Sequence, residues 1–170
     1  MRLPKTARCR KLVPDHRTIA LPDQPKPARA PLPRLDDFPH RSSDIVRFAD
    51  LDPQGHVNQA AFATYFETGR VAMFREPDLG IGAPGLTFVM VRQEIDYLAE
   101  LHWPGTLEIG TAVAAFGRSS FTVIQAVYCK QACAATARVT MVCIDLATRR
   151  PRPLPEDQVA RLSPYRYRGA

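Results

Sequence analysis

The segment DPQGHVN, residues 52–58, separates a short apolar stretch at residues 45–48 from a long helical pattern at residues 62–74. A strand-to-helix junction of this kind presents backbone N–H groups that favour negative charge. The segment adds a carboxylate, an imidazole and an amide to the junction. We therefore predict that a carbonyl group is attacked at this place.

The helical pattern after the junction has one apolar face. The residues of that face recur at spacings of three and four, and they are Phe62, Tyr65, Phe66, Gly69 and Met73. This spacing predicts an α-helix of about five turns. Pro77 and the glycine-rich segment 80–85 end the helix in a loop. Before the junction, residues 44–49 are predicted to form a first strand.

From Leu86 onward the apolar period changes to two, which is typical of strands with one covered face. The residues predicted to face the core have odd numbers, and they are Val89, Val91, Ile95, Tyr97, Leu107, Ile109, Thr111, Val113, Phe121, Val123, Gln125, Val127, Cys129, Ala137, Val139, Met141 and Cys143. We expect four long antiparallel strands and a short helix at residues 156–162. With the first strand, this predicts an α+β fold in which a five-stranded antiparallel sheet packs on one long helix.

The positive charge of the chain is confined to its first 41 residues. They contain ten Lys and Arg and four Asp, whereas residues 42–170 contain 13 basic and 13 acidic side chains, so the net charge of +6 belongs to the first segment. This segment also holds eight of the 16 prolines and lacks a helical or alternating apolar pattern. We predict a disordered, basic, Pro-rich extension at residues 1–41 and a folded domain at residues 42–170. A neutral domain makes nucleic-acid binding unexpected.

The four cysteines, Cys9, Cys129, Cys133 and Cys143, lack the paired C-x-x-C spacing of a zinc site, and no histidine cluster in the sequence completes one. We therefore expect no metal. No segment has the roughly 20 apolar residues needed to span a bilayer, and the first residues lack the apolar stretch of a secretory signal. A cytoplasmic protein without a membrane partner is expected.

Three motifs follow one another along the chain: FADLDPQGHVN at residues 48–58, YFETGR at residues 65–70, and EIDYL at residues 94–98 followed by Pro104-Gly105. Together they resemble the 4-hydroxybenzoyl-CoA thioesterase-like branch of the hot-dog acyl-CoA thioesterases. GRSSF at residues 117–121 and the closing strand at residues 135–145 fit the same pattern. The ordered match covers about residues 43–163.

This resemblance implies a hot-dog fold, in which the antiparallel sheet wraps around the central helix. It implies hydrolysis of a thioester between an acyl group and coenzyme A without a metal or another cofactor, because coenzyme A is part of the substrate. It also implies a homodimer whose two sheets join into one, often paired again into a homotetramer. The sites of such relatives commonly lie between subunits.

Asp52 aligns with the catalytic aspartate of this family, which either adds to the carbonyl to give a mixed anhydride or activates a water molecule. The structural alternative is a type I turn, since Asp-Pro-x-Gly is a favoured turn sequence. The resemblance makes the backbone N–H of Gln59 the oxyanion donor. His56 is a catalytic candidate that could orient Asp52, hold a water molecule or contact the thioester, or it is scaffolding. Asn58 faces the substrate or caps the helix.

Four further residues are candidates for substrate binding, and they are Gly55, Tyr65, Arg118 and Ser119. Tyr65 is expected in the core or in the wall of the acyl pocket. Arg118 and Ser119 are expected to approach the phosphates of the cofactor that carries the pantetheine. Glu67 is a second candidate acid, although Arg70 three residues later favours an ordinary ion pair.

Two alternatives to an acyl-CoA thioesterase remain at this stage. A thioesterase acting on acyl carrier protein would favour a basic docking patch, which only the extension supplies. A non-catalytic acyl-CoA-binding or regulatory protein on the same fold would bind the intact thioester without turnover.

Overall fold

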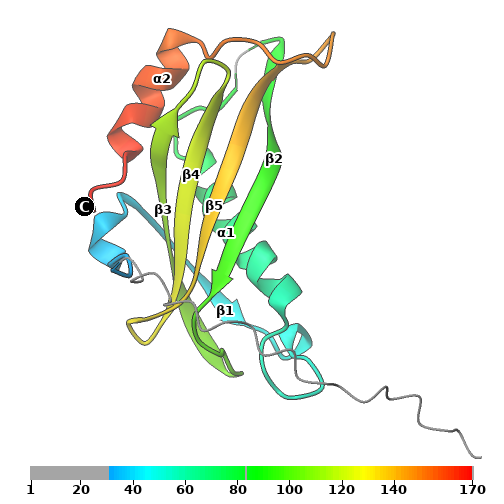
Figure 1. Ribbon diagram of the computed structural model, residues 1–170, viewed down its shortest axis with the longest axis vertical. Coiled ribbons are helices and arrows are strands. Elements are labelled where there is room, and N and C mark those ends of the chain that lie inside the picture. Colours follow the sequence, from blue (N-terminus) through cyan, green and yellow to red (C-terminus); the bar gives the residue numbers. More distant parts are fainter. Residues whose placement is uncertain (1–30, 83, 170) are drawn as a thin grey trace, which may run out of the picture. The chain divides into compact units, whose positions relative to one another are not determined.

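The computed structural model describes residues 31–82 and 84–169. Five strands form one antiparallel sheet in the order β1-β3-β4-β5-β2 (Figure 1). They are β1 (His40–Val46), β2 (Leu86–Tyr97), β3 (Gly105–Phe116), β4 (Ser120–Cys129) and β5 (Ala132–Asp145). The described helices include the 16-residue α1 (Gln59–Phe74) and the short α2 (Glu156–Leu162). None of the described helices is long and apolar enough to cross a membrane.

The long helix α1 lies against one face of the sheet, where it packs on β1, β3 and β4 (Figure 1). The predicted α+β hot-dog arrangement, a five-stranded antiparallel sheet around one central helix, is confirmed. The helix has about four and a half turns at 3.6 residues per turn. The predicted short helix at residues 156–162 is also confirmed.

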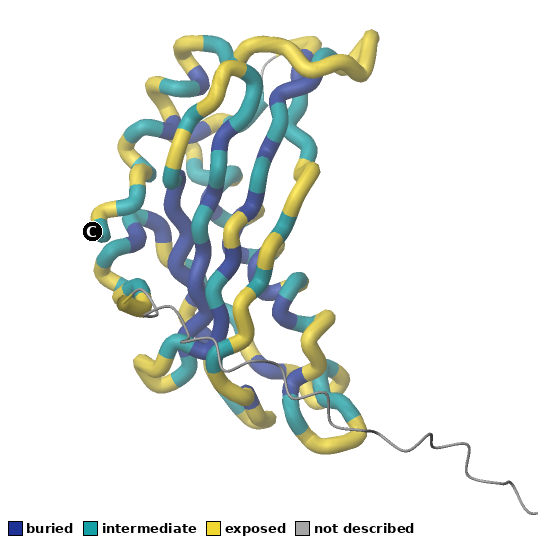
Figure 2. The backbone as a smooth tube through the Cα atoms, viewed as in Figure 1, coloured by how far each residue is buried: buried dark blue, intermediate teal, exposed yellow. Residues whose placement is uncertain are grey.

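The odd-numbered residues of the three central strands form the core face of the sheet, as the alternation predicts. Those with no exposed surface include Leu107, Ile109, Val113, Val123, Val127, Val139 and Cys143. Figure 2 shows buried segments along β3, β4 and β5. Phe62, Tyr65 and Phe66 of α1 pack against the part of this face that contains Leu107, Ile109 and Val127. Full burial of each large apolar side chain contributes roughly 1.5–3 kcal/mol, so this contact holds the helix on the sheet.

A buried amide joins the helix to the sheet in the middle of this core. The Nε2 group of Gln125 on β4 donates to the carbonyl of Phe66 at 2.8 Å and to the Thr111 hydroxyl on β3 at 3.0 Å. Its Oε1 accepts a hydrogen bond from Nη1 of Arg70 at 3.1 Å. Gln125 is 1% exposed and Arg70 is 6% exposed. We call this set, Gln125 with Phe66, Arg70 and Thr111, the Gln125 clamp.

Gly69 lies where α1 comes closest to the sheet. A Cβ atom built on it would be 2.5 Å from Cγ2 of Ile109 and 3.0 Å from the Thr111 hydroxyl oxygen. Real Cβ atoms essentially never approach a neighbour as closely as the first of these distances. A glycine here therefore lets the helix backbone reach the Gln125 clamp.

The core alternation predicted for β2 is wrong in its first half. A β-bulge between Met90 and Arg92 leaves Val91 as an extra residue opposite β5. Phe88 packs into the core before the bulge, and Ile95 packs into it after the bulge. Val91, which the period of two places inward, is 59% exposed. The extra residue reverses which of the alternating side chains face the core, and a prediction based on a strict period of two cannot include that reversal.

The first strand begins and ends earlier than predicted. It spans His40–Val46 rather than residues 44–49, because this stretch pairs with residues 105–111 of β3. The chain then forms a 3-10 turn at Phe48–Asp50, in which the Asp50 carboxylate accepts the Arg47 N–H at 2.8 Å. Turn formation therefore ends the strand before Phe48, although that residue continues the apolar stretch.

Structure also begins inside the segment predicted to be a disordered extension. Residues 35–37 form a 3-10 turn, and Phe38 is buried against Ala112, Ala126 and Tyr128 on the second face of the sheet. The folded unit accordingly starts at Leu32. The single aromatic anchor Phe38 is hard to recognise among prolines and charged residues. The part of the predicted extension up to residue 30 lies outside the described residues.

His40, at the start of β1, is a buried imidazole beside a carboxylate. Its side chain is 7% exposed, and its Nε2 lies 3.3 Å from the Glu76 carboxylate. Burial lowers the pKa of His40 from its ordinary value of 6.5 and outweighs the opposite effect of Glu76. The fold therefore favours the neutral imidazole.

Replacing Gly69 by alanine tests the close approach of helix and sheet. Overpacking a core typically destabilises the fold by about 1–3 kcal/mol, whereas replacing a helical glycine by alanine stabilises the helix by at most about 1 kcal/mol. Because the nearest contact is so short, we expect Gly69→Ala to lower the free energy of unfolding by about 1–2 kcal/mol in denaturant titration. Glu67→Ala, at an exposed position of the same helix, should change it by less than about 0.5 kcal/mol. A Gly69→Ala variant more stable than wild type would contradict the packing described.

The buried His40 predicts an acid-sensitive fold. Since its pKa is lower in the folded state than in the unfolded chain, the unfolded chain binds the additional proton as the pH falls below about 6.5. We expect the free energy of unfolding to decrease on acidification through this window, and the decrease to be smaller in His40→Gln. Denaturant titrations at a series of pH values would measure both slopes. An identical dependence of the free energy of unfolding on pH in both proteins would show that His40 does not cause the acid sensitivity.

Candidate active site

The segment at residues 52–58 folds into a turn that uses one oxygen of Asp52. Asp52 Oδ1 accepts the backbone N–H of Gln54 at 2.8 Å and that of His56 at 3.2 Å. The Gly55 N–H donates to the Asp52 carbonyl at 3.0 Å, and Gly55 has a φ of +83°, which favours glycine. The turn role of this sequence is therefore real. Within the described residues Oδ2 of Asp52 has no hydrogen-bond partner, so this oxygen can interact with a bound molecule.

The start of α1 leaves one backbone donor without a partner. Asn58 is the N-cap, and its side-chain oxygen accepts the Ala60 N–H at 2.9 Å, so its predicted capping role is confirmed. The Ala61 N–H donates to the Asn58 carbonyl at 2.9 Å. In the described part of the chain the N–H of Gln59 makes no hydrogen bond, as is usual for the first donors of a helix. This N–H and the helix dipole favour a negatively charged oxygen.

Three contacts fix the turn on the rest of the fold. The Val57 N–H donates to the carbonyl of Leu101 at 2.8 Å, and the Asn58 N–H donates to that of Asp50 at 2.8 Å. The hydroxyl of Tyr65 donates to the Asp50 carboxylate at 2.6 Å. Burial raises the pKa of Tyr65 strongly, so this hydroxyl stays protonated. Tyr65, a substrate-binding candidate in the sequence, is fully buried and supports the turn from inside the core.

A cavity of about 500 Å³ opens at this junction. Its walls come from the turn, from the first part of α1 and from the chain after β2, and its lining residues are Asp52, His56, Val57, Asn58, Gln59, Phe62, Tyr97, Leu98, Ala99 and Glu100. The ring of Tyr97 meets that of Phe62 edge-on with centroids 5.3 Å apart, and its hydroxyl donates to the Gln59 carbonyl at 3.3 Å. The four catalytic candidates from the sequence therefore line one cavity.

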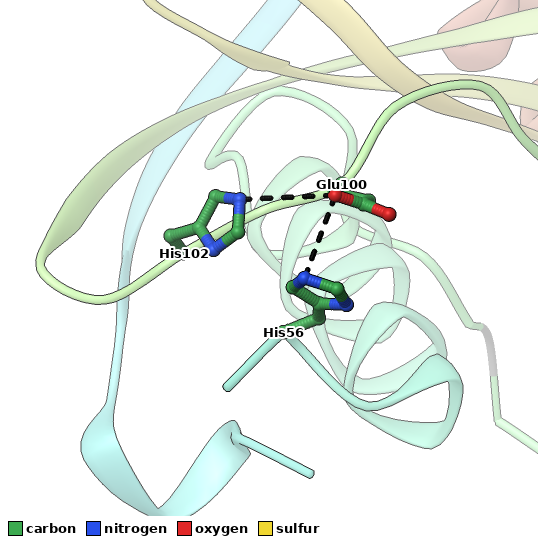
Figure 3. A group of neighbouring side chains, drawn as sticks. All are labelled: His56, Glu100 and His102. Atoms are coloured by element: carbon green, nitrogen blue, oxygen red, sulfur yellow. Dashed lines mark ion pairs between the residues drawn. The ribbon is translucent and has the colours of Figure 1, made fainter. Parts of the chain in front are cut away.

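Three titratable side chains gather at the rim of this cavity (Figure 3). The Nε2 atom of His56 lies 3.5 Å from Oε2 of Glu100, and that of His102 lies 4.0 Å from the same oxygen. We call His56, Glu100 and His102 the rim triad. Sequence reasoning missed Glu100 and His102, because they are far from His56 in the chain. The motif at residues 94–98 ends just before them. Its position next to these two residues was the one feature of the sequence that could have indicated them.

Two predicted substrate residues lie elsewhere in the chain. Arg118 and Ser119 occupy the turn between β3 and β4, at the end of β3 opposite to the one that follows the cavity-lining residues 97–100 (Figure 1). A 12-residue strand therefore separates them from Asp52 within one chain. Gly55 is exposed in the turn beside the cavity. Glu67, the second candidate acid, lines a different cavity of about 290 Å³ together with Arg70.

Comparison with known proteins adds sequence relatives to this geometry. A family model described as thioesterase-like superfamily matches residues 46–162. The acyl-CoA thioester hydrolase YbgC of Escherichia coli O157:H7 is 27% identical over 119 residues, which cover 68% of this chain and 89% of that protein. The match therefore extends over nearly the whole of that relative.

Solved structures with the same fold are also similar to this chain. A thioesterase from Thermus thermophilus, complexed with coenzyme A and Zn, is 35% identical with a TM-score of 0.65, over 75% of this chain and 93% of that chain. The probable thioesterase YbaW from Escherichia coli is 25% identical with a TM-score of 0.68, over 74% of this chain and 98% of that chain. Both matches therefore extend over about three quarters of this chain.

Proposed function

Because the chain belongs to the thioesterase-like superfamily, we propose that it hydrolyses the thioester of an acyl-CoA to the free acid and coenzyme A. The similar protein YbgC is named as an acyl-CoA thioester hydrolase, and the Thermus thermophilus thioesterase was solved with coenzyme A. A substrate that carries coenzyme A is therefore the natural first choice for this chain.

One observation carries the proposal. The half-buried carboxylate of Asp52 and the N-terminus of α1 at Gln59 line the same cavity. Asp52 has an oxygen without a partner, and Gln59 has an N–H without one, both within the described residues. A base or nucleophile beside a donor for developing negative charge is the pairing that attack on a carbonyl requires.

Two chemical routes use this pairing. In the first, Asp52 Oδ2 takes a proton from water, the resulting hydroxide adds to the thioester carbon, and the C–S bond then breaks to release the thiolate; Asp52 then gives its proton to the thiolate or to solvent and becomes a carboxylate again. In the second, Asp52 itself adds to that carbon and displaces the thiolate, and water then hydrolyses the mixed anhydride to regenerate the carboxylate. In both, the Gln59 N–H stabilises the oxyanion. A thiol with a pKa near 8.5 leaves readily without a strong general acid.

The other candidates take supporting roles in this proposal. The His56 imidazole faces Glu100 rather than the Asp52 carboxylate, so we place it at the thioester or at a bound water molecule. The Asn58 side chain accepts the Ala60 N–H, so the Gln59 N–H at the same helix start remains without a partner beside the cavity. Phe62 and Tyr97 supply an aromatic wall for the acyl group. Gly55 lets the turn close beside the substrate.

We further propose that the chain forms a homodimer through β2, as a minimum assembly. β2 is an edge strand of the sheet, has 12 residues, and exposes Met90 and Val91 by 47% and 59%. A long edge with apolar side chains is suited to pairing with another strand. Tyr97 at the end of β2 lines the cavity, so a partner there would approach the site. Arg118 and Ser119 would then reach a substrate only from a partner subunit.

Substituting Asp52 by asparagine tests the catalytic proposal. Asparagine keeps the turn bonds but is neither a base nor a carboxylate nucleophile, so the fold should persist while kcat falls by about 10²–10⁴. Thiol release from short aliphatic, long aliphatic and aromatic acyl-CoAs would measure the loss and the acyl preference. Glu67→Gln is the matched control and should retain activity.

The outcomes of this experiment separate the competing functions. Full activity in Asp52→Asn with loss in Glu67→Gln would move the catalytic acid to the helix. If the wild type leaves every acyl-CoA intact, acyl-carrier-protein thioesters are the next substrates to assay. Binding of intact acyl-CoA without any turnover would instead support the non-catalytic alternative.

The dimer proposal predicts a charge-sensitive interface on β2. In a two-fold pairing of this strand, Val91→Glu would bring like charges together, so we expect the variant to sediment as a smaller species than the wild type. Leu146→Glu, at a comparably exposed leucine outside the sheet edge, should sediment as the wild type does. A wild type that is monomeric at micromolar concentration in analytical ultracentrifugation would refute the proposal.

A further inference from the structure

The backbone places the rim triad by a simple rule of alternation. The Val57 N–H bonds to the Leu101 carbonyl at 2.8 Å, and both side chains are buried, with exposures of 6% and 4%. The residues on either side of these two are more exposed than they are, so their side chains point away from the core. His56 precedes Val57, and Glu100 and His102 flank Leu101, so all three side chains emerge together. The fold therefore brings them together through the backbone, independently of any attraction between them.

The ligand atoms of the triad are close to the spacing that one metal ion requires. Two bonds of about 2.0–2.2 Å in a tetrahedral site place ligand atoms about 3.4 Å apart. Oε2 of Glu100 lies 3.5 Å from Nε2 of His56 and 4.0 Å from Nε2 of His102 (Figure 3). One ligand atom from each residue lies within 4.8 Å of the others. Small rotamer adjustments would bring all three to bonding distance.

The chemistry of the donors selects a class of ion. Two imidazole nitrogens and one carboxylate oxygen suit Zn²⁺ and its first-row neighbours, whereas Mg²⁺ and Ca²⁺ prefer all-oxygen sites. The exposed fractions of Glu100 and His102 are 67% and 60%, and that of His56 is 33%. Solvent can therefore provide the remaining ligand of a four-coordinate site, and the side chains can adjust.

We propose that the rim triad binds one Zn²⁺-class ion, which couples the turn to the chain after β2 and restricts the cavity. His56 and Glu100 line the main cavity, while Glu100 and His102 line a second one of about 210 Å³. An ion bound between the two cavities would fix His56 at the rim, so that its imidazole could no longer contact the substrate. The ion is consequently an inhibitor of turnover, and this last step rests on the proposed function.

Metal titration of the full-length protein tests the site without any substrate. We expect one Zn²⁺ per chain in competition with a chromophoric chelator, and Co²⁺ should give the visible absorption of a four-coordinate ion. Glu100→Gln and His102→Gln should each weaken binding by more than about tenfold, because each removes one of three protein ligands. Glu94→Gln, an exposed carboxylate on β2 that pairs with Arg92, is the matched control and should bind like the wild type.

Circular dichroism of each variant establishes that these exposed substitutions leave the fold intact. No stoichiometric binding in the wild type would overturn the proposal. Binding of equal strength in Glu100→Gln and His102→Gln would also overturn it, because the ion would then lie elsewhere in the chain. Failure of the thioesterase assay would leave these binding results unaffected, so the two proposals fail separately.

The inhibitory effect is measured by acyl-CoA hydrolysis with and without Zn²⁺. We expect stoichiometric Zn²⁺ to slow the wild type severalfold and to leave the rate of His102→Gln nearly unchanged, because this variant lacks one of the three protein ligands. His102 does not line the main cavity, so its substitution should leave the metal-free rate close to that of the wild type. Faster hydrolysis with Zn²⁺, or an equal loss of rate in His102→Gln, would overturn the inhibitory role.

Discussion

The buried amide of Gln125 joins the central helix to the sheet, and the position of the helix N-terminus at the candidate site depends on that contact. A buried amide without partners is costly, so its bonds to the Phe66 carbonyl and the Thr111 hydroxyl define one height and one rotation for α1. Gly69 permits the required approach. Because the helix cannot slide without breaking these bonds, its N-terminus at Gln59 stays at the same edge of the sheet.

In the proposed mechanism, the groups that carry out the chemistry also stabilise the fold. Asp52 closes its turn with one oxygen and keeps the other without a partner among the described residues. Asn58 satisfies Ala60 and leaves the Gln59 N–H to the cavity. Asp50 and Tyr65 hold the same turn from inside the core. Under this proposal, a 16-residue helix and a seven-residue turn provide most of the catalytic groups.

The sequence predicted those parts of the fold that depend on local pattern. The core faces of β3, β4 and β5, the helix α2 and the cap at Asn58 follow from periodicity and capping preference, and the structure confirms them. The phase of β2 and the start of β1 depend on pairing with distant strands, so the local pattern misplaced them. The rim triad depends on one backbone bond between Val57 and Leu101, which no spacing along the sequence reveals.

The bulge at Val91 divides β2 into two halves that are phased separately. The half before it contributes Phe88 to one end of the core, and the half after it contributes Ile95 to the other end and Tyr97 to the cavity. Substitutions near Tyr97, in the proposed acyl wall, are therefore separated by the bulge from the packing around Phe88. Under the proposed function, this separation would let the acyl wall change while the packing around Phe88 is retained.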